Sequence, residues 1–333
     1  MTEFTVLLLT LFFASLVTFR KESSFSKEKM PAIKFFMAIV IVLGHLSVRV
    51  PSGWIQPFRF WGSPFVSMFL FVSGYGMWQS ALSNSELSFA SVLKRVWKLA
   101  LPYLLTVFLY YIIVRIPSGE TNLNIWDAVL AGTSKQYHLW FVFAIVYLYL
   151  AFYLCMRFRS KRAIIVSLFA LVSATIVMLR QVGYDRCWWV SLLAFPTGCL
   201  YSMFHERVNE IIFKSRLSYF MAMAVAVTGV GLSYLLNVEM LYSISHIFIP
   251  IALALVVIQL PIEKLNNRFT IHFGYISYEI YLCQLIAMDA LQLFIPSMPP
   301  FVYILSSLAL TMILAEIVYF ASLQMLPGKE RTS

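Results

Sequence analysis

Two ionisable residues stand at either end of an apolar run near the start of the chain. Lys34 is followed by FFMAIVIVLG and then by His45. Eleven residues of α-helix rise by about 16 Å, so a lysine at a membrane boundary would place His45 near the middle of a bilayer. A neutral imidazole at that depth can act as a general base or as a nucleophile; the alternative is a structural hydrogen bond to a neighbouring helix. We take His45 as the candidate catalytic residue.

A second group of basic residues follows an aromatic-rich run. The run FLFVSGY contains Ser73 and Tyr75, and the segment Lys94-Arg95-Val-Trp-Lys98 comes after it. Arg95 and Lys98 are three positions apart, so they share one face of a helix. Two cations at a membrane face can bind phosphate groups, but basic residues also accumulate at cytoplasmic boundaries for topological reasons alone. The sequence leaves both interpretations open.

Two further polar segments lie within or at the edge of apolar runs. One opens with His138 and Trp140, where aromatic residues ordinarily anchor a helix at the interface. The other, GYISYEIYLCQ, contains Glu279, Tyr281 and Gln284. It is too polar for a helix that faces lipid, so we expect it to face the interior of a bundle. The four cysteines lack the spacing of zinc ligands, and we expect no metal site.

Helices that cross a membrane must position these residues. The chain is 61% hydrophobic and 12% charged with a mean hydropathy of +0.81, whereas a soluble domain carries about 25% charged residues. A helix needs ~20 apolar residues to span ~30 Å of hydrocarbon. Runs near this length fall at 4–19, 33–50, 63–80, 99–116, 137–156, 163–179, 187–204, 217–236, 241–260, 274–292 and 300–322. We predict an all-α polytopic transmembrane bundle of about eleven helices.

The basic residues indicate the orientation of this bundle. Most of the 25 Lys and Arg residues fall in the loops on one side of the predicted membrane, which the positive-inside rule assigns to the cytoplasm. The N-terminus is then outside and the C-terminus cytoplasmic. Topology accounts for most of the net charge of +10, and we expect no nucleic-acid partner.

Taken in order, the segments resemble the acyltransferase 3 family of membrane acyltransferases, particularly those that O-acetylate bacterial surface polysaccharides. The family has a basic residue, ten residues and a histidine, here Lys34 to His45. FLFVSGY matches its Ser-Gly-aromatic element, and Arg95-Val-Trp-Lys98 is similar to its R-x-x-R element. His138-Leu-Trp-Phe and ISYEIYL match two further motifs. Each motif is weak alone, but five in the right order are specific.

The resemblance covers roughly Ala32 to Leu323, ten of the eleven predicted spans. The chain differs from the family pattern in two ways, by two lysines in place of arginines and by a glutamine in place of a histidine. Lys34 and Lys98 keep the charge of arginine but lose its planar fork. Gln284 stands where many relatives have a second histidine, which puts a catalytic role for that position in doubt.

The resemblance implies a donor and an acceptor. The donor would be cytoplasmic acetyl-coenzyme A, a co-substrate rather than a permanently bound cofactor, and the acceptor a hydroxyl of a surface or lipid-linked glycan. His45 would be catalytic, and Lys34, Arg95 and Lys98 would bind the acyl-coenzyme A. The residues that could line the pocket are Ser73, Tyr75, His138, Trp140, Glu279, Tyr281 and Gln284.

The same comparison suggests how the chain is divided. We expect an N-terminal transmembrane helix and cytoplasmic basic loop at 1–30, an acyltransferase 3-like membrane domain at 31–325, and a cytoplasmic tail at 326–333. The expected location is the bacterial inner membrane, with membrane lipids around the bundle.

A transporter or flippase of lipid-linked sugars is the main alternative function. Such a protein would also have about a dozen helices with polar interior groups, but transporters often show repeated halves and broken helices. The sequence shows no internal repeat.

Overall fold

Every regular element in the described part of the chain is helical. The computed structural model describes residues 12–13, 16–17, 19–20, 28–50, 53–83, 88–119, 140–235 and 239–325. Its α-helices are α2 (Met30–Arg49), α3 (Gly62–Ser83), α4 (Phe89–Tyr110), α6 (Trp140–Cys155), α7 (Lys161–Gln181), α8 (Ala194–Ile212), α9 (Arg216–Leu235), α10 (Glu239–Gln259), α11 (Arg268–Tyr275), α12 (Ser277–Phe294) and α13 (Pro300–Met325). The prediction of an all-α bundle is confirmed.

Six of the described helical stretches are long and apolar enough to cross a membrane. They are Met30–Arg49, Phe89–Arg115, Lys161–Gln181, Arg216–Ser233, Tyr242–Gln259 and Pro300–Met325, and the shorter Trp140–Cys155 is also apolar. This confirms that the chain holds several candidate membrane spans. Eleven crossings and the orientation of the termini stay predictions, and most of the predicted first helix lies outside the described residues.

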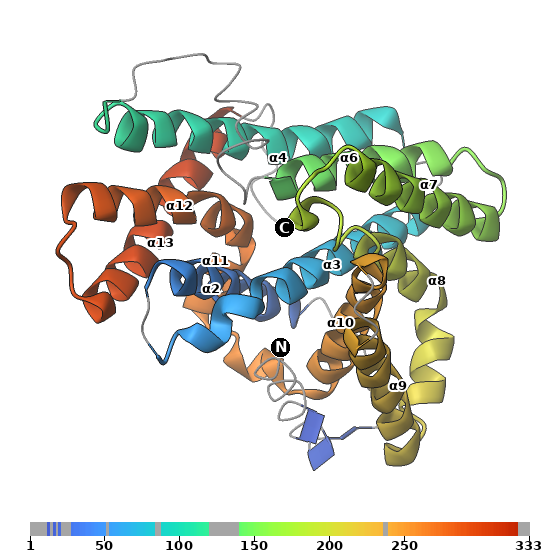
Figure 1. Ribbon diagram of the computed structural model, residues 1–333. Helices are drawn as coiled ribbons and strands as arrows, with labels where there is room; N and C mark the ends of the chain where they lie inside the picture. The colour runs from blue at the N-terminus through green and yellow to red at the C-terminus, as the bar shows by residue number, and fades with distance from the viewer. Residues whose placement is uncertain are drawn as a thin grey trace.

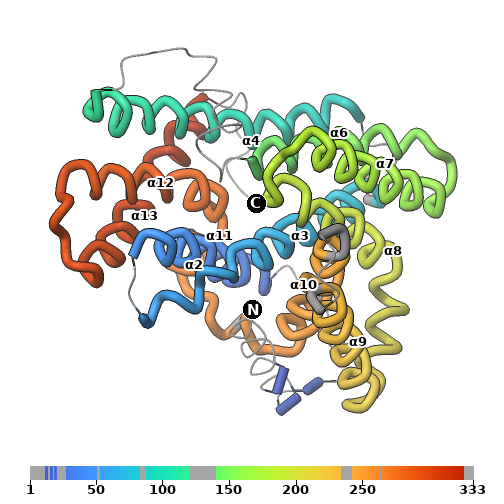
Figure 2. Tube along the Cα trace, in the orientation of Figure 1, coloured from blue at the N-terminus to red at the C-terminus, as the bar shows by residue number. Residues whose placement is uncertain are grey.

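Helix α3 runs through the middle of the molecule (Figure 1). Helices α4, α6 and α7 lie on one side of it, and α2, α11 and α10 lie on the other. Segments far apart in the sequence meet in this arrangement: α12 returns beside α2, and α13 packs against α12, as the tube in Figure 2 shows. One interior is therefore built from both ends of the chain.

Glycines let α3 and α8 touch backbone to backbone. A Cβ atom on Gly74 would lie 2.1 Å from the carbonyl oxygen of Phe195, and one on Gly198 would lie 2.0 Å from that of Phe71. Hydrogen bonds join the same surfaces, since Cys199 Sγ donates to the Gly74 carbonyl at 3.3 Å. The glycine of the FLFVSGY run thus has a packing role.

Two predicted helix boundaries are wrong. The span predicted at 187–204 begins as a 3-10 turn, η5 (Arg186–Trp188), and α8 starts only at Ala194. Trp189 is 2% exposed and the residues up to Leu193 are also buried, so this apolar run is buried by protein. Pro196, which suits the first turn of a helix, lies at the true start.

The predicted span at 274–292 is also interrupted. Helix α11 ends at Tyr275 and α12 begins at Ser277, with Ile276 between them. The helix α4, in contrast, begins ten residues before the predicted run and includes the basic segment 94–98. It continues at its other end into the π-helical turn η2 (Tyr111–Arg115).

Candidate functional site

A cavity of about 780 Å³ lies between α2, α3, α4, α6, α8 and α12. Small-molecule sites typically enclose about 300–1,000 Å³. Four residues singled out from the sequence line this cavity: Lys34, Ser73, Tyr75 and Arg95. Residues from three separate motifs therefore share one binding-sized space.

The charged residues of the cavity are cationic. Lys34 comes from α2 and Arg95 from α4, and the described lining contains no carboxylate. The Arg95 guanidinium donates a hydrogen bond from Nη2 to Ser80 Oγ at 2.7 Å, which fixes it against α3. Lys34 and Arg95 are both half-buried, and charges interact more strongly there than in bulk water. The cavity is suited to an anionic ligand.

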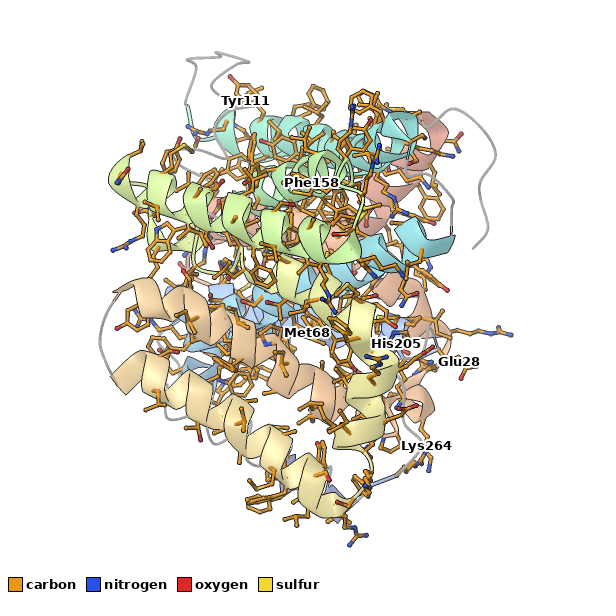
Figure 3. The ribbon with its side chains drawn as sticks, turned by 90° about the vertical axis from the view of Figure 1, so that its right-hand side faces the viewer. Glu28, Met68, Tyr111, Phe158, His205 and Lys264 are labelled. Carbon is orange, nitrogen blue, oxygen red and sulfur yellow. The ribbon has the colours of Figure 1, made fainter. Side chains whose placement is uncertain are left out.

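Phenol and imidazole groups form much of the polar wall. The Tyr149 hydroxyl is hydrogen-bonded to Ser73 and faces Arg95, and the Tyr278 hydroxyl donates to the Leu99 carbonyl at 2.9 Å. His205 projects from α8 (Figure 3), and its ring lies perpendicular to that of Tyr75 with 6.2 Å between centroids.

The sequence did not identify Tyr149, His205 or Tyr278 as site residues. His205 belongs to no recognised motif, and Tyr149 lies within an aromatic run. Tyr278 is part of ISYEIYL, where the pattern gave no reason to prefer it over its neighbours.

A narrow apolar slot continues the cavity. The slot, of about 40 Å³, shares Phe69, Phe141 and Tyr278 with the cavity and is also lined by Ile41 and by the predicted residue Tyr281. The Tyr281 ring packs against Phe141 with 5.3 Å between centroids. A slender, largely apolar group would fit this slot better than a sugar ring.

His45 lies beyond the slot on the same face of α2. Lys34, Ile41 and His45 follow the spacing i, i+7 and i+11, which brings them to one side of a helix about 16 Å long from first to last. His45 is half-buried, and it is not among the described residues that line the cavity or the slot. It stands one turn past Ile41.

An ion pair lies one further turn along α2. The Arg49 guanidinium is hydrogen-bonded to Asp289 of α12, and the Tyr110 hydroxyl of α4 donates to the other Asp289 oxygen at 3.0 Å. Arg49 and Asp289 side chains are each 21% exposed. His45 therefore lies between the slot and a bridge that joins α2, α4 and α12.

Two predicted residues of α12 are buried away from the described cavity lining. Glu279 is 8% and Gln284 0% exposed. Gln284 Nε2 donates to the Tyr281 carbonyl at 2.9 Å, while Gln284 Oε1 has no hydrogen-bond partner among the described residues. Gln284 therefore lies outside both described hollows, with its amide oxygen enclosed by protein.

The other predicted residues are placed differently. Trp140 is 7% exposed at the start of α6 and does not line the cavity. Lys98 is exposed on α4 and is not in the described lining, so the shared face with Arg95 does not bring both to the cavity. His138 lies outside the described residues. Within the described ranges, no three His, Cys, Asp or Glu side chains gather as metal ligands would.

Comparison with known proteins identifies the family of the chain. The acyltransferase 3 family model, described as an acyltransferase domain, matches residues 29–320. No curated protein and no solved structure was found to match the chain. The matched region includes all six helices around the cavity.

Proposed function

The chain belongs to the acyltransferase 3 family, and from this premise we propose that it transfers an acetyl group from acetyl-coenzyme A to a hydroxyl of a surface polysaccharide or its lipid-linked precursor. The observation that carries the proposal is the cavity. Its described lining holds Lys34 and Arg95 and no carboxylate, and an apolar slot leads from it toward His45. A cationic cavity followed by an apolar slot and a histidine matches a donor that has phosphates at one end and a thioester on a slender arm at the other.

Lys34 and Arg95 are proposed to bind the donor's pyrophosphate. Charge-assisted hydrogen bonds to phosphate are short and strong, and the fork of Arg95 can make two of them at once. Ser73 and Tyr75 line the same wall and can supply weaker polar contacts. Lys98, which is exposed outside the lining, remains a predicted contact at the mouth.

His45 is proposed to carry the chemistry in one of two ways. As a nucleophile, its neutral imidazole nitrogen attacks the thioester carbonyl, the carbon–sulfur bond breaks, and the thiolate of coenzyme A takes up a proton. The acceptor hydroxyl then displaces the imidazole and gives up its proton. As a general base, His45 instead removes the hydroxyl proton while the hydroxyl oxygen attacks the thioester carbonyl directly. The carbon–sulfur bond then breaks, and the leaving thiolate of coenzyme A takes the proton back from His45.

The proposed orientation separates donor and acceptor. With the N-terminus outside and the C-terminus cytoplasmic in a bacterial inner membrane, Lys34 is at the cytoplasmic end of α2 and His45 near mid-membrane. Only the small acetyl group then needs to pass from one side to the other. A relay through acetyl-histidine suits this geometry.

The direct test is acetyl transfer by purified protein in lipid nanodiscs. His45→Ala should reduce transfer from radiolabelled acetyl-coenzyme A by at least about a hundredfold, as expected for loss of a general base or nucleophile. His272→Ala is the matched control, because His272 is a partly exposed histidine on α11 paired with Glu316. Transfer by His45→Ala at the control rate would exclude both roles.

The same assay without acceptor separates the two mechanisms. A nucleophilic His45 should retain hydroxylamine-sensitive label on the wild-type protein and none on His45→Ala, whereas a general base leaves the wild type unlabelled. Comparing surface polysaccharide from strains with and without the gene by NMR addresses the flippase alternative. Unchanged base-labile acetyl groups would exclude acetyl transfer to that polysaccharide.

A further inference from the structure

A second hollow adjoins the cavity at His205. This basic groove, of about 460 Å³, lies between the end of α3, the start of α7 and the middle of α8. His205 lines both the groove and the cavity. A ligand held in the cavity can therefore extend past His205 into the groove.

The groove combines three cations with an aromatic ring. Among the described residues that line it, Lys161 and Arg162 come from the first turn of α7 and Arg207 from α8, with one carboxylate, Glu206, beside them. The start of α7 adds the partial positive charge of a helix N-terminus. Phe204, which is 38% exposed, lines the same groove. Cations beside an exposed aromatic ring suit a phosphorylated nucleotide, because bases stack on such rings.

We propose that the basic groove binds the nucleotide end of the donor, with Arg162 and Arg207 on the phosphate of its ribose and Phe204 against its base. This inference rests on the proposed function, in which Lys34 and Arg95 hold the pyrophosphate and the acyl arm enters the slot. The nucleotide of coenzyme A is then left at the mouth of the cavity, where His205 marks the start of the groove. Its ribose phosphate carries a charge of roughly −2 and needs cations of its own.

The proposal gives these cations a role beyond topology. Lysine and arginine on the predicted cytoplasmic side need no ligand to explain them. However, Arg159 and Lys214 are also exposed on that side and do not line the groove. Arg162 and Arg207 line the groove that opens from the cavity, whereas Arg159 and Lys214 do not. Replacing each pair therefore separates the effect of the groove from the effect of lost charge.

The test uses adenosine 3′,5′-bisphosphate, which has the nucleotide but no acyl arm. Its binding to the full-length protein in nanodiscs is measured by isothermal titration calorimetry. Arg162→Ala/Arg207→Ala should weaken binding by at least about tenfold, since each hydrogen bond to a charged group contributes about that much. The control Arg159→Ala/Lys214→Ala, which removes the same charge, should bind as the wild type does.

Kinetics provide the second readout. The wild type should show a lower KM for acetyl-coenzyme A than for its 3′-dephospho form, and the groove variant should lose this preference while kcat stays the same. Because all four substituted residues are exposed, an unchanged unfolding midpoint serves as the folding check, and Arg162→Lys/Arg207→Lys should retain part of the binding.

The two proposals fail in different ways. Equal bisphosphate affinity in the groove variant and the control, or no binding by the wild type, would overturn the groove proposal even if acetyl transfer is observed. Absence of acetyl transfer in the wild type would overturn the proposed function, and the calorimetry would still decide whether the groove binds a nucleotide.

Discussion

The contact between α3 and α8 gives the sharpest prediction, because both helices line the cavity. Gly74→Ala would place a Cβ atom 2.1 Å from the Phe195 carbonyl oxygen, and real Cβ atoms essentially never approach closer than 3.0 Å. The oxygen must therefore move by about 0.9 Å, the difference between these distances. It belongs to the backbone of α8, so the helix must shift as a whole.

Such a shift should affect stability and activity together. Overpacking in a close-packed interior costs about 1–3 kcal/mol, and each kcal/mol lowers an unfolding midpoint by roughly 2–4 °C in a chain of a few hundred residues. Ser73 and Tyr75 of α3 line the cavity together with His205 of α8, so the distances between the two helices' side chains in the cavity change too. A misplacement of about 1 Å can reduce turnover by about a hundredfold.

The assay compares unfolding midpoints in detergent and acetyl transfer for four variants: Gly74→Ala, Gly198→Ala, the double variant and a control. Gly231→Ala on α9 is the control, because its Cβ would meet nothing within 4 Å, and it should be neutral or slightly stabilising. The reciprocal contact of Gly198 with Phe71 tests the mechanism. If α3 and α8 move apart once, the space gained accommodates both new methyl groups. Gly74→Ala/Gly198→Ala should therefore lower the free energy of unfolding by clearly less than the sum of the two single changes. Wild-type behaviour of Gly74→Ala, or full additivity, would refute a shared backbone contact.

Two further predictions concern charged residues. Arg95→Ala should raise the KM for acetyl-coenzyme A by about tenfold because Arg95 lines the cavity. Lys98→Ala should raise this KM less. Equal increases in the two variants would contradict the assignment of Arg95 to the donor site. Asp289→Ala should destabilise the protein by about 2 kcal/mol because it leaves a largely buried Arg49 without its carboxylate. Asp289→Asn should be milder in thermal unfolding, since it keeps an oxygen for Tyr110, and a reversed order would argue against the bridge.

The sequence predicted the helices well where apolar runs were long. Seven of the ten predicted runs after the first correspond closely to a single described helix, because burial in lipid requires such runs. The start of α8 was wrong because the residues before Ala194 are apolar but buried by protein, and composition does not distinguish these two environments. The break at Ile276 was missed although Gly274 lies two residues before it, because this glycine is inside α11, where it packs against the backbone of Pro31.

The candidate site was predicted in part. Lys34, Ser73, Tyr75 and Arg95 were chosen from separate motifs, and the fold brings them to one cavity. The contribution of His205 could not be predicted, since it depends on how α8 crosses α3 rather than on any local pattern.

The basic groove could not be predicted from the sequence either. Lys161, Arg162 and Arg207 contribute to the positive-inside signal in the sequence. Charge bias along a chain carries no information about which loops meet in space. Only the packing of α3, α7 and α8 separates them from cations such as Arg159.

The cavity also has a consequence for how the protein is made. Its walls come from six helices, from Lys34 on α2 to Tyr278 at the start of α12. A chain still emerging from the ribosome has no complete cavity until α12 has joined the bundle. A ligand that fills the cavity would bind only the finished fold, and its binding free energy would add to the stability of the assembled bundle. Ligand binding would thereby favour chains whose six cavity helices are all in place.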